Sequence, residues 1–228
     1  MVHWIANALH KKPLSTIEAP IESPMIDEAV LSPLRIKETN YYNYFFTGDE
    51  EGNLKQWSLL DFSLLNSYDG IGNGCIWTMD ITYDKKFLFF GDDEGNIRQL
   101  KISTGEIVTE YLKAHDYAIY AMVIPKGPKY GKTIFSVGKK GFLKQWSISD
   151  KELTKDYGKI HERAIMSMQS THDGEFLFTA GQYGFLKQWS VSRQCLFRDF
   201  KRVHADPIYS MVVTKDNKRV FTSDCCGN

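Results

Sequence analysis

Three histidines recur at regular spacing and are the first candidates for chemistry in this chain. His115, His161 and His204 each open a similar phrase, and they lie 46 and 43 residues apart. Imidazoles can bind a metal ion or act as general bases, but both roles need partners that converge on one point. One histidine per repeated unit keeps the rings apart. We therefore predict structural histidines, and neither a metal site nor a catalytic residue.

Two acidic turns and an adjacent pair of cysteines are the other candidates. The turns Asp49–Gly52 and Asp92–Gly95 are rich in carboxylates, but they break the alternate-residue spacing of calcium loops, so we predict solvated turns. Cys225 and Cys226 fall in a segment that we expect to be a turn connecting two strands. We favour plain turn residues, and redox activity is the alternative. The spacing of the four cysteines matches no zinc site, so we expect all of them to be free thiols. Free thiols are typical of a reducing compartment, here the cytoplasm. The four are Cys75, Cys195, Cys225 and Cys226.

Composition narrows the function classes further. The 228 residues include 28 lysines and arginines and 28 aspartates and glutamates, so the net charge is zero and we expect no nucleic-acid partner. No stretch approaches the roughly 20 apolar residues that span a bilayer, and the amino end lacks the layout of a secretion signal. The sequence contains no Gly-x-Ser-x-Gly, phosphate-loop or dinucleotide fingerprint. We expect no cofactor, no small-molecule substrate and no enzymatic activity.

The elements that position these residues follow from an internal repeat. One phrase recurs with its leading glycines 43, 46, 43 and 43 residues apart, and its last copy is cut short. Each copy joins short segments rich in aromatic and β-branched residues, bounded by Gly, Asp, Asn or Lys, which predicts strands joined by tight turns. Four antiparallel strands per unit predict an all-β fold. The copies are Gly52–Trp57, Gly95–Leu100, Gly141–Trp146, Gly184–Trp189 and the start at Gly227.

In period and phrase order the chain resembles the WD-repeat family of β-propellers over residues 35–228. The closing Trp-Asp of that family is replaced by Trp-Ser, as at Trp57-Ser58. The resemblance implies four blades and part of a fifth, and we expect an incomplete (open) propeller after an extended lead-in at 1–34. Either the chain is the front part of a longer protein, which we favour, or the lead-in closes the ring. The expected blades are 35–68, 75–112, 118–157, 164–200 and, in part, 207–228.

The resemblance also implies hydrogen-bonded sets of histidine, hydroxyl, aspartate and tryptophan. The aspartate should directly precede the glycine of each phrase, but no unit has it there, so we expect incomplete sets and neutral imidazoles. The second unit, with Gly72, Phe90 and Leu100 at these positions, should rely on apolar packing alone. Glutamines replace a usual apolar residue at Gln56, Gln99, Gln145 and Gln188. Either they bond backbone across a seam, which we favour, or the seam is wet. The predicted sets are His115, Ser136 and Trp146; His161, Thr179 and Trp189; and His204 with Thr222.

Carried over by position, the resemblance implies a partner-binding rim where the first strands begin and the second strands turn into the third. Large aromatic and methionine side chains suit interface anchors, with mere filling of the blade tops as the alternative. Acidic turns on the first two blades and Lys139 and Lys140 on the third predict a rim of divided charge. The predicted rim residues are Trp77, Tyr120, Met166, Tyr209, Asp93, Lys139, Lys140 and Gln182.

These expectations favour a non-catalytic scaffold that binds other proteins or peptides. The alternative is a regulatory propeller domain of a larger enzyme, with the catalytic part beyond Asn228.

Overall fold

The computed structural model describes residues 30–32, 44–126 and 130–227, and this part of the chain is all β, without a helix. Its strands form four antiparallel sheets of four strands and a fifth sheet of two strands. In each sheet the strands follow one another in chain order, so strands that pair in a sheet are also neighbours along the chain. No helix in the described residues could cross a bilayer.

The strands of the first two sheets are β1 (Val30–Ser32), β2 (Tyr44–Gly48), β3 (Leu54–Ser58), β4 (Leu64–Tyr68), β5 (Ile76–Ile81), β6 (Phe87–Asp92), β7 (Ile97–Lys101) and β8 (Glu106–Tyr111). Those of the next two are β9 (Ile119–Val123), β10 (Thr133–Gly138), β11 (Phe142–Ser147), β12 (Leu153–Lys159), β13 (Ile165–Ser170), β14 (Phe176–Gly181), β15 (Phe185–Ser190) and β16 (Cys195–Arg202). The fifth sheet holds β17 (Ile208–Val213) and β18 (Val220–Asp224).

The first sheet takes its first strand from inside the segment expected to be a lead-in. Residues 30–32 pair antiparallel with β2, and Leu31 lies opposite Thr47. The lead-in therefore contributes a strand to the sheet arrangement. Of the remaining expected lead-in, residues 1–29 and 33–34 lie outside the described part.

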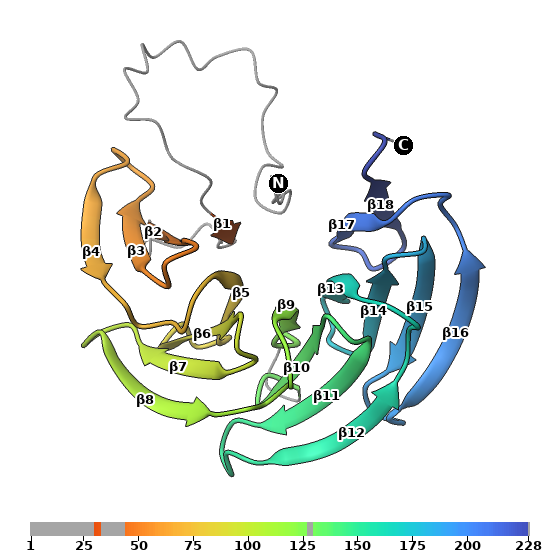
Figure 1. Cartoon of the computed structure of the whole chain (residues 1–228), viewed down its shortest axis with the longest axis horizontal. Coiled ribbons are helices and arrows are strands. Elements are labelled where there is room, and N and C mark those ends of the chain that lie inside the picture. The colour runs from red at the N-terminus through yellow and green to blue at the C-terminus, as the bar shows by residue number, and fades with distance from the viewer. Residues whose placement is uncertain (1–29, 33–43, 127–129, 228) are drawn as a thin grey trace.

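The sheets follow one another around an arc, and the first strand of each sheet lies on its inner side (Figure 1). Neighbouring inner strands, β5 with β9, β9 with β13 and β13 with β17, contact one another. The last strands of the complete sheets, β4, β8, β12 and β16, lie on the outer side (Figure 1). This arrangement brings the equivalent ends of all inner strands to a common region.

The hydrophobic core lies between neighbouring sheets, and a middle strand such as β6 is buried on both faces. Phe89 and Phe90 are adjacent in β6 and both are fully buried, although successive side chains of a strand point to opposite faces. Phe90 packs in a cluster with Phe46 of the first sheet, whereas Phe89 packs in a cluster with Ile134 of the third. Each sheet is thus stabilised by its neighbours, as in other repeat architectures.

The glycine that opens each of the four full copies of the phrase lies against the loop of the next sheet. Gly141 has φ +82, a conformation that disfavours side chains, and a Cβ placed there would lie 2.1 Å from the carbonyl oxygen of His161. The carbonyl of Gly141 in turn accepts the backbone N–H of Ile160 at 2.8 Å. Gly95 and Gly184 make the same close approach to His115 and His204. The repeat needs glycine because backbone of the next unit occupies the space of a side chain.

Candidate functional site

Two of the repeated histidines lie in equivalent hydrogen-bonded sets inside the third and fourth sheets. His115 Nε2 lies 2.8 Å from Ser136 Oγ, which also accepts the indole N–H of Trp146 at 2.8 Å. The fourth sheet repeats this geometry at 3.0 and 3.1 Å with His161, Thr179 and Trp189. The hydroxyl of the second strand therefore joins the loop before the first strand to the third strand of the same sheet.

The two buried rings are neutral at physiological pH. Burial, with a contribution from the Lys144 ammonium, lowers the pKa of His115 to about 4. Burial and Lys187 lower the pKa of His161 to about 4 in the same way. The residue at the end of β14 is a glycine and offers the ring no carboxylate, and a Cβ on Gly181 would lie 2.7 Å from His161 Nδ1. The expected neutral imidazoles at these two positions are confirmed.

The fifth sheet holds a carboxylate that the sequence analysis placed wrongly. Asp224 Oδ2 lies 3.1 Å from His204 Nδ1, while His204 Nε2 lies 2.8 Å from Thr222 Oγ1. The carboxylate stands three residues before Gly227 rather than directly before it, because the end of β18 lies beside the histidine loop and the turn leads away from it. The expectation that His204 lacks a carboxylate partner is therefore wrong.

The expectation that the second sheet relies on apolar packing alone is also wrong. Asp92, the equivalent of Asp224, is fully buried and accepts a hydrogen bond from the Arg98 guanidinium. Arg98 also donates to Asn73 Oδ1 at 3.0 Å, and the backbone N–H of Asn96 donates to Asp92 at 2.9 Å. A buried ion pair thus stands in the second sheet, and Arg98 occupies the place that lysine has in the other phrases.

Two of the four repeated glutamines, Gln56 and Gln145, bond side chains of their own sheet, and not backbone across a seam. Gln56 Oε1 accepts the amide N–H of Asn66 on β4 at 2.8 Å. Gln145 Oε1 accepts the phenol of Tyr157 on β12, also at 2.8 Å. At these two positions the favoured interpretation is wrong, because a polar side chain on the adjacent outer strand lies within reach of the amide.

Each predicted first-strand rim residue is the extra residue of a β-bulge. In β5, Ile76 lies opposite Asp92 and Thr78 lies opposite the adjacent Gly91, so the register skips Trp77 between them. The registers of β9, β13 and β17 skip one residue in the same way. A bulge redirects a side chain out of the regular alternation and is frequent beside binding sites. The four residues at these bulges are all half-buried: Trp77, Tyr120, Met166 and Tyr209.

The bulged residues lie at the same end of the sheets as the turns between second and third strands. The Trp77 and Tyr120 rings contact each other edge to face, with centroids 5.2 Å apart, and the Trp77 indole donates to the Asp93 carboxylate. Lys140 Nζ lies 4.6 Å from the centre of the Tyr117 ring. Lys139 and Gln182 are exposed, and their backbone N–H groups donate to loop carbonyls at 3.2 and 2.9 Å. The structure therefore brings aromatic, acidic and basic groups together at one edge.

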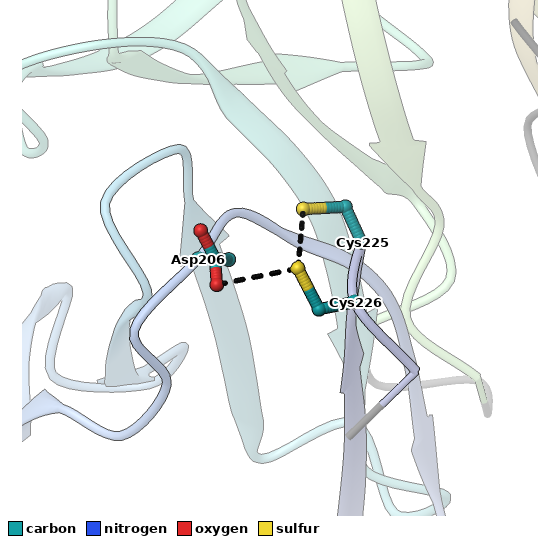
Figure 2. A group of neighbouring side chains, drawn as sticks. All are labelled: Asp206, Cys225 and Cys226. Atoms are coloured by element: carbon teal, nitrogen blue, oxygen red, sulfur yellow. Dashed lines mark hydrogen bonds between the residues drawn. The ribbon is translucent and has the colours of Figure 1, made fainter.

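The four cysteines are free thiols, as expected. Cys75 is buried, and burial raises its pKa to about 12. Cys225 and Cys226 are exposed in the turn after β18, where the Cys226 thiol donates to Asp206 at 3.4 Å (Figure 2). Sequence reasoning missed Asp206 because it lies in a different loop, 19 residues before Cys225.

Comparison with known proteins adds no relative: no family model matches the chain, and no curated protein matches it.

Proposed function

We propose that the sheets of this chain are blades of a WD-repeat β-propeller and that the chain acts as a non-catalytic scaffold for other proteins or peptides. Two features support the propeller: the tandem four-stranded units of the sequence and the equivalent hydrogen-bonded sets of successive sheets. Free thiols on the surface fit a reducing compartment, so we place the scaffold in the cytoplasm.

The observation that carries the binding proposal is the recurrence of a bulge at the same position in consecutive inner strands. Regular pairing would be the simplest way to build a sheet, yet in the second to fifth sheets one large side chain is turned out of the strand register. Tyr, Trp and Met are enriched in the centres of protein interfaces because they offer large contact areas. We name the four residues Trp77, Tyr120, Met166 and Tyr209 the bulge row.

The surroundings of the bulge row indicate the chemistry of its partner. The exposed acids Glu50, Asp93 and Glu94 lie in turns of the first and second sheets, whereas Lys139 and Lys140 lie in the equivalent turn of the third. Asp92 adds nothing to the surface charge because it is buried against Arg98. The proposed partner is a protein segment with apolar side chains flanked by basic groups on one side and acidic groups on the other.

Affinity capture with the natural protein tests this function. The variant Tyr120→Ala/Met166→Ala removes two side chains of the bulge row, and the control Leu60→Ala/Leu64→Ala removes two exposed leucines at the β3–β4 connection, the opposite end of the first sheet. Partners captured by the wild type should be lost with the first variant and kept with the control. Equal recovery with all three proteins, each shown to be folded by circular dichroism, would refute the assignment.

A further inference from the structure

We propose that Asp206, Cys225 and Cys226 form a binding site for a thiophilic divalent cation, with Zn²⁺ as the ion that their geometry matches. One oxygen and two sulfur atoms from these side chains all lie within 4.8 Å of one another. They come from two segments, the loop between β16 and β17 and the turn after β18 (Figure 2). This inference does not depend on the proposed scaffold function.

Two of the three separations between the proposed ligand atoms agree with tetrahedral coordination. Zinc bonds of about 2.3 Å to sulfur and about 2.0 Å to oxygen place two sulfur ligands roughly 3.8 Å apart and a sulfur and an oxygen roughly 3.5 Å apart. The Sγ atoms of Cys225 and Cys226 are 3.9 Å apart, and Cys226 Sγ lies 3.4 Å from Asp206 Oδ2. These two distances fall within about 0.1 Å of the tetrahedral values. The third pair, Cys225 Sγ with the Asp206 carboxylate, lies within 4.8 Å, so rotation of the exposed Cys225 side chain or of the Asp206 side chain closes the set around an ion.

Backbone contacts hold the two segments together independently of the thiols. The N–H of Cys225 donates to the Pro207 carbonyl at 3.2 Å, which ties the turn to the loop. The N–H of Cys226 donates to Asp224 Oδ1 at 3.0 Å, and the other oxygen of that carboxylate faces His204 at 3.1 Å. The ligands are therefore presented by a preformed frame, which lowers the entropy that an ion must overcome on binding.

The equivalent turns of the other sheets show that this position tolerates varied chemistry. In the second sheet the loop residue Asn73 donates to Glu94 at 2.9 Å, and in the third sheet Lys140 stacks on Tyr117. The same contact between loop and turn joins a carboxylate to two thiols in the fifth sheet. Here the contact combines two soft sulfur ligands with one oxygen, a set that suits zinc better than calcium or magnesium.

Three protein ligands leave a fourth coordination position to water or to a group on a partner. Binding would replace the two thiol protons by Zn²⁺, so two protons leave and the net charge of the three side chains with the ion stays at minus one. Cys225 stands at the turn position that Asp93, Lys139 and Gln182 occupy in other sheets. A bound ion would therefore lie at the same end of the sheets as the bulge row.

Cobalt titration of the full chain tests the site, because Co²⁺ replaces Zn²⁺ and gives thiolate charge-transfer and tetrahedral ligand-field absorption. The protein is kept reduced with a phosphine. We expect one equivalent of Co²⁺ to bind and to be displaced by Zn²⁺. Cys225→Ser/Cys226→Ser should abolish the thiolate bands, and Asp206→Asn should weaken binding at least about tenfold. The control Cys195→Ser removes another exposed thiol and should leave the titration unchanged.

Three results would overturn the proposal. They are the absence of thiolate bands in the wild type, bands that persist in Cys225→Ser/Cys226→Ser, and weak binding that all variants share, which would mean an adventitious ion only. Because both cysteines are exposed, circular dichroism and the thermal midpoint should remain at wild-type values in the double variant without metal. If the double variant is folded and lacks the bands, removal of the sulfur ligands, and not unfolding, is the cause.

Discussion

At the scale of single residues, the buried histidines link stability to pH. The folded chain keeps His115 and His161 neutral down to about pH 4, whereas an unfolded chain protonates them near pH 6.5. Because the unfolded state binds more protons in this interval, the free energy of unfolding should fall as the pH drops from about 6.5 to about 4. Each ring could contribute up to roughly 3 kcal/mol to that fall.

Nuclear magnetic resonance measures this prediction directly. The ring proton shifts of His115 and His161 should titrate with midpoints below pH 5. His161→Gln should also reduce the slope of unfolding free energy against pH by about one proton between pH 6.5 and 4, measured by urea denaturation. His172→Gln, which removes an imidazole outside the hydrogen-bonded sets, is the control. Midpoints near 6.5 for both buried rings would contradict the account.

The buried ion pair of the second sheet gives a second prediction for single residues. Arg98→Leu leaves the Asp92 carboxylate buried without its guanidinium, and we expect a loss of about 3 kcal/mol in unfolding free energy. Asp92→Asn/Arg98→Leu should recover part of that loss, because no unpaired charge remains. Denaturation of both variants in guanidinium chloride measures their free energies of unfolding. If the double variant were less stable than Arg98→Leu, burial of an unpaired charge would not be the cause.

At the scale of elements, two glycines separate the stability cost of a steric clash with the next sheet from the stability cost of backbone strain alone. Gly141 and Gly158 both have positive φ, +82 and +72, but a Cβ at Gly158 would meet nothing within 4 Å. Gly158→Ala should therefore cost about 1 kcal/mol, and Gly141→Ala at least about 3 kcal/mol. Chemical denaturation compares the two. Equal losses would mean that the contact with His161 does not hold the sheets together.

The elements were largely predictable from the sequence, and the polar contacts between them were not. Tandem phrases with tight-turn residues at their ends specify hairpins, so the strand order within sheets followed. The contact of Asp224 with His204 could not be predicted from the sequence. The aspartate was expected at position 226, and the path of the chain at the end of β18 places the residue two positions earlier beside the ring. The bulge at Trp77 was hidden as well, since a bulge is defined by the register with the neighbouring strand. Contacts such as Asp206 with Cys226 depend on how separate loops meet.

At the scale of the whole molecule, the divided charge of the rim predicts an effect on association rate. Lys139→Glu/Lys140→Glu should slow association with the captured partner by about tenfold at low salt, and the difference should shrink as salt screens the charges. Lys215→Glu/Lys218→Glu makes the same charge change in the β17–β18 turn, at the opposite end of its sheet, and is the matched control. Stopped-flow binding at two salt concentrations measures both. Equal slowing by the two variants would mean that total charge, and not its position, matters.

The central claim is that the bulge row forms one continuous partner-binding surface, and site-specific photocrosslinking tests it most directly. The crosslinking amino acid p-benzoylphenylalanine is placed at Tyr120 in the natural protein in its own cells, and at the exposed Leu60 for comparison. The account predicts a discrete adduct with another protein from position 120 and none from position 60. An adduct from position 60 alone, or the same adduct from both positions, would contradict it.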